Sequence, residues 1–269
     1  MHAEKTPFKV EIDGHIAWLT LDRPDKRNAM GLEFFPAVTE HFRSFDQDPN
    51  VRVVVIKAEG KSFTVGLDLM EAGGILTDRT AAGREALRLK IIELQQSMNA
   101  IELCRKPVIA AVHSHCIGGG LDMLSACDIR LATADAVFSI RETRIAIIAD
   151  LGTLQRLPAI IGDGWFRELA FTGRDFSAEE ALQMRFITRI CKDQEDLYAY
   201  ARELAAQIAA NAPLTVQGVK DVILYNRDNG VYPGLQYVAQ KNSAQLQSDD
   251  LMEAVTAFME KREPHFKGN

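Results

Sequence analysis

The sequence predicts an α/β fold, because strand–helix–strand repeats form its first part and helices alone form its last part. Residues 51–57 and 108–112 are apolar, rich in β-branched side chains and without alternation, so both are expected to be strands covered on both faces. Residues 234–262 have a helical period instead. We therefore divide the chain into an α/β core over residues 1–200 and a helical C-terminal subdomain over residues 201–269.

Turn and cap residues indicate where the elements begin and end. Asp13-Gly14, between two alternating segments, is typical of a hairpin turn. Ser177 and Glu180 have the spacing of a capping box. Pro213 ends one helix and begins the next. The expected elements are a hairpin over 8–22, a helix over 32–46, a strand over 51–57, a helix over 80–104, a strand over 108–112, a short helix ending near 127, strands over 128–132 and 137–140, and helices from 153 onward apart from a strand-like 186–191.

Composition argues against several classes of protein. The formal net charge is -6, whereas a nucleic-acid partner held by phosphate contacts needs a basic face. Four cysteines without a C-x-x-C pair are expected to be reduced core thiols. No apolar run is long enough to span a membrane, and the first residues resemble neither a signal nor a transit peptide. We expect a cytoplasmic protein with no nucleic-acid or membrane partner.

Common cofactor and metal motifs fail on inspection. The segment ending in Gly60-Lys61-Ser62 has Val55 where a phosphate-binding P-loop needs glycine. Gly118-x-Gly120 has Met123 in place of the third glycine of a dinucleotide fingerprint. His113 and His115 share a strand face but have no acidic or thiol partner at a metal-ligand spacing. The sequence therefore predicts neither a metal nor a cofactor.

Two glycine-containing segments each follow a buried strand and lead into a helix. Residues 62–69 contain Gly66, and residues 116–122 contain three consecutive glycines. Free N–H groups at such turns can stabilise the negative charge of an enolate or oxyanion, and glycine lets a ligand approach the backbone closely. Each segment alone is an ordinary strand-to-helix turn, but the pair predicts two donors aimed at one oxygen.

These segments, F-x-x-G-x-D-L and C-I-G-G-G-x-D, resemble the crotonase (enoyl-CoA hydratase/isomerase) superfamily. LDRPDKRNAM at 21–30, ACDIRLATADAVFSIRE at 126–142 and FMEKREPHFKG at 258–268 extend the resemblance over nearly the whole chain. It implies stacked ββα units in a spiral core, a helical oligomerisation subdomain, trimers or hexamers, and an acyl-CoA thioester substrate. It also implies an oxyanion hole made by the N–H groups of Leu67 and Gly119. The residues expected to contact the substrate or its CoA are Arg27, Ala29, Gly66, Asp68, Leu69, Met70, Gly120, Phe266 and Lys267.

Three acids, Asp122, Glu142 and Asp150, resemble those of the Δ3,5-Δ2,4-dienoyl-CoA isomerase subgroup. The resemblance implies catalytic roles in fatty acid β-oxidation. Moving both double bonds takes a proton from C2 and adds one at C6, which suits two acids spaced along the acyl chain. We expect Glu142 at C2 and Asp122 as a supporting group. Apolar neighbours are expected to raise the carboxyl pKa values by desolvation, namely Ile145, Ile147, Ile148 and Leu151.

Each acid also has an ordinary structural explanation. Asp122 could favour a helix dipole, Glu142 could pair with Arg141 or Arg144, and Asp150 could cap a helix that begins near residue 151. Two functional alternatives stay open, an enoyl-CoA hydratase and a catalytically idle crotonase-fold binding protein.

Two positions depart from the pattern of the subgroup. Ala146 stands where glycine is usual, and Ile148 stands where a small residue is common. Both side chains are expected to narrow the acyl pocket.

Overall fold

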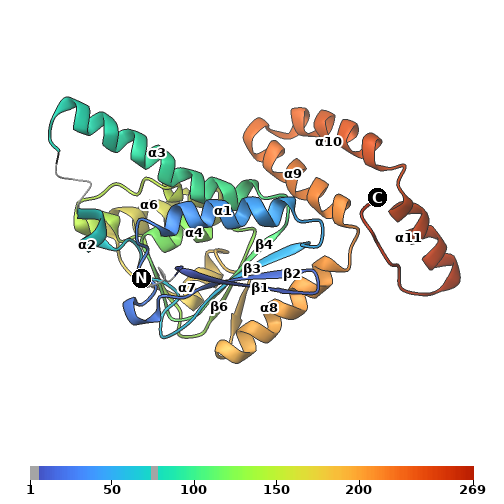
Figure 1. The fold of residues 1–269 in the computed structure, drawn as a ribbon, viewed down its shortest axis with the longest axis horizontal. Helices are drawn as coiled ribbons and strands as arrows, with labels where there is room; N and C mark the ends of the chain where they lie inside the picture. The colour runs from blue at the N-terminus through green and yellow to red at the C-terminus, as the bar shows by residue number, and fades with distance from the viewer. Residues whose placement is uncertain (1–5, 74–77) are drawn as a thin grey trace, which may run out of the picture.

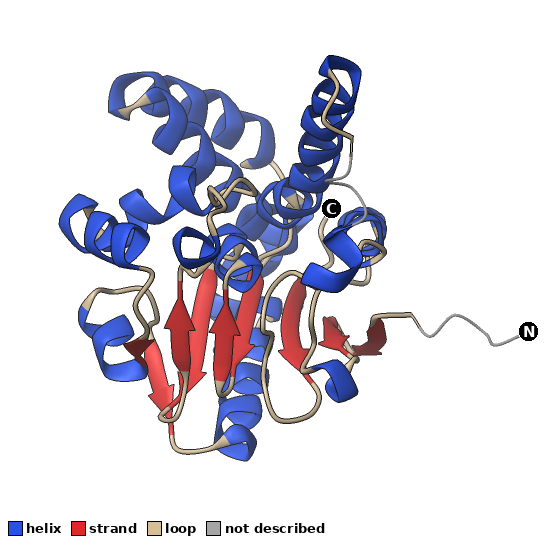
Figure 2. Ribbon diagram, turned by 90° about the vertical axis from the view of Figure 1, so that its left-hand side faces the viewer, coloured by secondary structure: helices blue, strands red, loops and turns tan. Residues whose placement is uncertain are grey.

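A computed structural model describes residues 6–73 and 78–269 of the chain. Its main sheet has six strands in the order β1-β2-β3-β4-β6-β9, antiparallel between β1 and β2 and parallel elsewhere (Figure 2). The strands span Phe8–Asp13, Ile16–Leu21, Val53–Ala58, Val108–Val112, Ile129–Thr133 and Arg189–Cys191. A second sheet has the order β5-β7-β8, with strands at His115–Ile117, Val137–Ser139 and Phe176–Ser177.

Helices cover both faces of the main sheet, as the uninterrupted apolar strands predict. Along β3, Val54 and Ile56 belong to the core that includes α1 and α3, whereas Val53 and Val55 pack with α8. The helices are α1 (Phe34–Gln47), α2 (Leu69–Ala72), α3 (Ala81–Leu103), α4 (Gly119–Ala126), α5 (Thr153–Ile161), α6 (Asp163–Thr172), α7 (Ala178–Gln183), α8 (Gln194–Ala209), α9 (Pro213–Asn229), α10 (Val231–Gln245) and α11 (Asp249–Glu260), with 3₁₀ turns at Pro24–Lys26 and Glu142–Ile145.

Most expected elements are confirmed within a few residues. The hairpin turns after Asp13, and the capping box of Ser177 and Glu180 is formed in both directions. The short strands β5 and β8 were not predicted, because two or three residues are too few to show a period. The helical stretch at the end of the chain is interrupted before α11, where the Ser248 hydroxyl accepts a hydrogen bond from Leu251 N.

α10 and α11 extend away from the body that contains the sheet (Figure 1). α9 contacts this body through Lys220 and Arg227, which pair with Asp128 and Glu102. α10 packs on α9, where the rings of Tyr225 and Tyr237 stack at 4.1 Å. The expected domain boundary at residue 200 falls inside α8, which packs on the main sheet. Over residues 6–73 and 78–269, no helix is long and apolar enough to cross a membrane.

Candidate active site

The two glycine-containing loops leave neighbouring parallel strands and meet. The first follows β3 and the second follows β4 and β5, and a bridge between Thr64 and Cys116 joins them. An ideal Cβ on Gly119 would lie only 4.0 Å from Leu67 N. Among the described residues, neither of these two N–H groups donates to a protein acceptor. Two free donors therefore lie side by side, which is the arrangement that an oxyanion hole requires.

Glycine is required where the loops touch. Gly66 has φ +83°, and a Cβ there would lie 2.7 Å from the carbonyl oxygen of Ile117 and 3.4 Å from Gly119 N. Gly118 has φ +55°, and its Cβ would lie 3.0 Å from Glu142 Oε1. The absence of side chains thus lets the two loops, and one of the acids, approach each other closely.

Asn28 holds the first loop in place, although the sequence did not single it out. This buried residue has φ +54°, a conformation that asparagine tolerates better than most residues. Its amide donates to the carbonyl oxygens of Glu59 and Ser62, and its own carbonyl oxygen accepts from the Thr64 hydroxyl at 2.7 Å. Thr64 Oγ1 in turn accepts from Gly66 N at 3.1 Å. The signal in the sequence was a lone Asn inside a charged loop.

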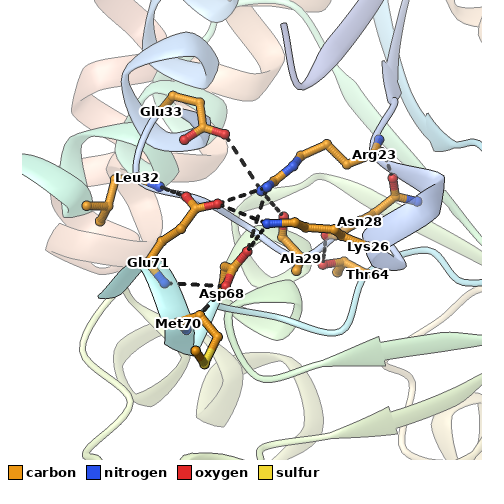
Figure 3. A network of polar contacts seen from close by, with 10 residues as sticks. All are labelled: Arg23, Lys26, Asn28, Ala29, Leu32, Glu33, Thr64, Asp68, Met70 and Glu71. Atoms are coloured by element: carbon orange, nitrogen blue, oxygen red, sulfur yellow. Dashed lines mark hydrogen bonds and ion pairs between the residues drawn. The ribbon is translucent and has the colours of Figure 1, made fainter. Parts of the chain in front are cut away.

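A charged network fixes the start of α2, directly after Leu67 (Figure 3). Asp68 accepts hydrogen bonds from the N–H groups of Met70 and Glu71, and it pairs with Lys26 at 3.3 Å. Arg23 pairs with Glu71 at 2.9 Å. Asp68 was expected to contact the substrate, but its carboxylate is occupied as a helix cap and ion-pair partner.

Asp122 is a buried acid that holds the start of α5. Its side chain is 2% exposed, and Oδ1 accepts a hydrogen bond from Thr153 N at 2.7 Å. The pKa of Asp122 is raised to about 7, mainly by burial and also by the charges of Glu142 and Asp150, against the hydrogen bonds from Thr153. Asp122 therefore does more than interact with the dipole of its own helix, α4, because its carboxyl also accepts a hydrogen bond from the start of α5.

The ordinary explanations for the other two acids are not supported. Glu142 forms no ion pair among the described residues, and its buried Oε2 has no hydrogen-bond partner there. Arg141 pairs with Asp175 instead. The cap of α5 is Gly152, so Asp150 does not cap that helix.

The pKa values of both acids are shifted in the same direction. Burial raises the pKa of Glu142, and the nearby Asp150 charge adds to this effect. Burial also raises the pKa of Asp150. A raised carboxyl pKa favours the protonated form near neutral pH, which a general acid needs.

All three acids and both free N–H groups line one cavity of about 310 Å³. Its remaining wall is mainly apolar, with Leu87, Ile91 and Leu94 contributed by α3. Ile145 and Ile147 line it as expected. The expectation for Ile148 was wrong, because this side chain is 77% exposed and does not line the cavity. The reason is a turn of the chain: Ala146, with φ +59°, ends the 3₁₀ turn and does not line the cavity either.

The other residues expected to contact the substrate or its CoA differ in exposure. Arg27 and Met70 are exposed, and Leu69 is half-exposed; Leu69 and Met70 directly follow the loop that contains Gly66 and Leu67. Ala29 O accepts from Arg23, while Gly120 packs without a side chain against Thr64 and Cys116.

Phe266 and Lys267 are not brought to this site. Arg52, just before β3, donates to Phe266 O at 2.7 Å, and Lys267 N donates to Asp250 at 2.7 Å. The oxyanion loop leaves the other end of β3, so the two regions are separated by the length of this strand, about 20 Å for six residues.

A comparison with known proteins identifies the family. The family model for enoyl-CoA hydratase/isomerase matches residues 11–269, so the chain belongs to this family. A solved structure of an enoyl-CoA hydratase from Bacillus anthracis superposes with a TM-score of 0.91 at 31% identity, covering 98% of this chain and 100% of that one. The crotonase-like architecture expected from the resemblance is thereby confirmed.

Among its relatives are proteins of one particular activity. The chain is 45% identical over 259 residues to the peroxisomal Δ(3,5)-Δ(2,4)-dienoyl-CoA isomerase of Arabidopsis thaliana, covering 94% of this chain and 93% of the relative. It is 44% identical over 254 residues to the mitochondrial protein of that name from Homo sapiens, covering 93% and 77%.

These names contradict the expectation of a cytoplasmic protein, because the relatives belong to peroxisomes and mitochondria. The thiol content on which that expectation partly depended does not distinguish one reducing compartment from another. Residues 1–5, on which it also depended, lie outside the described residues.

Proposed function

We propose that this chain is a Δ3,5-Δ2,4-dienoyl-CoA isomerase of fatty acid β-oxidation. The observation that carries the proposal is the cavity in which Asp122, Glu142 and Asp150 meet the free N–H groups of Leu67 and Gly119. Relatives at 42–45% identity with the same printed activity support it.

The reaction moves two protons and retains every atom of the substrate. Glu142 takes a proton from C2, the electrons of that C–H bond form a C1–C2 double bond, and the carbonyl pair moves to the thioester oxygen. This oxygen carries the charge of the extended enolate and accepts hydrogen bonds from Leu67 N and Gly119 N. In the second step the carbonyl forms again, the C1–C2 pair moves to C2–C3 and the C3–C4 pair moves to C4–C5. The C5–C6 pair takes a proton from Asp150 at C6.

The two acids must start in opposite protonation states. Burial raises the pKa of both carboxyls, and the Asp150 charge raises that of Glu142 further, so the two together favour holding one proton. In the proposed reaction Asp150 holds this proton and Glu142 is ionised. Asp122 supports the site by holding the start of α5, and its titration is linked to the charges of Glu142 and Asp150. No metal or cofactor enters these steps, so the assay contains EDTA and no nicotinamide or flavin.

Asp150→Asn tests the proposal. The amide has a similar size but cannot transfer the proton, so isomerisation of a 3,5-dienoyl-CoA should fall by about 10²–10⁴. Glu142→Gln should behave likewise, and the double variant should be little worse than the more impaired single one, because the two acids act as a unit. The reaction is followed by the absorbance gained when the diene becomes conjugated with the thioester.

Asp163→Asn is the matched control, because Asp163 is exposed and pairs with Arg167 on the surface. It should isomerise at the wild-type rate. Wild-type turnover by Asp150→Asn would contradict the proposal. Hydration of a 2-enoyl-CoA with no isomerisation by the wild type would favour the alternative of a hydratase.

We further propose that the chain forms a homo-oligomer, a trimer or a hexamer. α11 exposes apolar side chains that a monomer leaves in water, with Phe258 84% and Met259 69% exposed. Phe266 and Lys267 lie too far from the oxyanion hole of their own chain, so they would reach a bound CoA only from another copy.

A further inference from the structure

The loop that carries Asp150 is held by three separate elements. From α3, Gln95 Nε2 donates to the carbonyl oxygen of Asp150 at 2.7 Å. From α4, the Asp122 carboxylate accepts from Thr153 N at 2.7 Å. From α5, Arg156 Nη1 lies 3.4 Å from the carbonyl oxygen of Leu151. Each of these three contacts holds the backbone and leaves the Asp150 carboxyl free to face the cavity.

Arg156 also packs directly on the backbone at Gly152. This glycine has φ +130°, and a Cβ there would lie 1.8 Å from Arg156 Nη1. The guanidinium therefore occupies the space that any side chain at position 152 would need. The Arg156 side chain is only 10% exposed, so the surrounding protein encloses it in this position.

A buried acid holds the guanidinium in this position. Glu102 of α3 is 12% exposed, and its oxygens lie 3.0 Å from Arg156 Nε and Nη2. Asn99 adds a hydrogen bond to Nη2 at 2.8 Å. Burial acts to raise the pKa of Glu102, but hydrogen bonds from Arg156 and Arg227 outweigh it and leave the pKa below its ordinary value, so the glutamate is ionised.

Stability alone does not explain this buried pair of charges. The desolvation of two buried ions offsets most of their attraction, so such a pair contributes little net stability. It does fix geometry, because Arg156 Nη2 donates hydrogen bonds to both Glu102 and Asn99 while Nε lies 3.0 Å from the same carboxylate, which gives the planar guanidinium a defined orientation. Here the oriented group is the Arg156 guanidinium, and it contacts Leu151 and Gly152, the two residues directly after Asp150.

We propose that Arg156, oriented by Glu102, is a positioning residue that holds Asp150 at the C6 end of the substrate. The inference rests on the proposed isomerase function. It predicts that loss of Arg156 slows protonation at C6 while proton removal at C2 continues, because within the described part of the chain Arg156 forms no hydrogen bond or ion pair with Glu142 or with the loops that contain Leu67 and Gly119.

The experiment follows both steps with one substrate. A 3,5-dienoyl-CoA is incubated with the enzyme in D₂O, and two rates are measured: formation of the conjugated product, and deuterium entry at C2 of the recovered substrate. For Arg156→Gln we expect product formation to fall about 10²-fold, as for a reacting group misplaced by about 1 Å. Deuterium entry at C2 should stay within about threefold. Asp150→Asn should give the same signature.

Arg227→Gln is the matched control, because Arg227 pairs with the same Glu102 but, over residues 6–73 and 78–269, forms no hydrogen bond or ion pair with the 150–152 loop. Both of its rates should match those of the wild type. If Arg156→Gln folds poorly, Gln95→Met replaces it, since this change removes another backbone contact of the loop without leaving a buried charge.

Four results would overturn the inference. They are unchanged product formation in Arg156→Gln and Gln95→Met, an equal fall of both rates, an equal effect of Arg227→Gln, and a wild type that forms no conjugated diene. The last of these is a failure of the proposed function itself, and it is recognised in the wild type before any variant is made.

Discussion

Gly66→Ala should damage the oxyanion hole without touching any acid. The new methyl carbon would lie 2.7 Å from Ile117 O, whereas ordinary contacts of a Cβ begin at 3.4 Å, so the two loops must separate by about 0.7 Å. Leu67 N and Gly119 N belong to these two loops. A displacement of this size costs about 10²-fold in rate when it misplaces reacting groups. We therefore expect kcat to fall about 10²-fold.

The control for this variant is Gly14→Ala. Gly14 also has a positive φ, +57°, but a Cβ there has no neighbour within 4 Å. Both substitutions cost roughly 1–2 kcal/mol from the left-handed backbone conformation, and only the first moves the donors. Chemical denaturation measures that stability cost, and the dienoyl-CoA assay measures kcat. Wild-type kcat in folded Gly66→Ala would refute the assignment of this contact to the oxyanion hole.

Two further predictions concern pH and assembly. The pKa of Asp122 is raised from 3.8 to about 7, so the folded state keeps a proton that the unfolded chain releases, and the free energy of unfolding should fall as pH rises through this window. At about 1.4 kcal/mol per pH unit, the free energy of unfolding of the wild type should fall by roughly 4 kcal/mol between pH 4 and pH 7 because of this group. Asp122→Asn should lack this part of the fall. An equal pH dependence of the unfolding free energy in both proteins would argue against a raised pKa. Light scattering at micromolar concentration should give a trimer or hexamer, and Phe258→Asp should dissociate it, since this side chain is 84% exposed in one chain; a stable wild-type monomer would contradict the assembly.

The elements that could be predicted are those long enough to show the repeat of their apolar residues. The buried strand over 51–57 and the helix over 80–104 each contain enough residues for their pattern to be unambiguous. The meeting of the two glycine loops could be predicted as well, because adjacent parallel strands bring their carboxyl ends to one edge. β5 and β8 escaped prediction since three and two residues have no measurable period.

The side-chain environment of the site was harder to predict. Ile148 follows Ile147 in an apolar run, yet a left-handed residue just before them turns one side chain to the cavity and the other to solvent. Gln95 and Arg156 reach the Asp150 loop from helices whose relative placement no local pattern specifies. Asp68 was assigned to the substrate because of its motif, whereas its contacts are those of a helix cap.

The donors of the proposed oxyanion hole belong to the main chain, and this has a consequence for how such a protein can diverge. Almost any residue supplies the N–H at position 67, so substitutions there leave the enolate-binding function intact as long as the glycines beside it persist. The acids, in contrast, can be gained or lost one at a time. A lineage that retains the loops can therefore exchange one reaction for another by gaining or losing a single carboxylate. No ancestor on this route needs to lose the ability to bind thioesters.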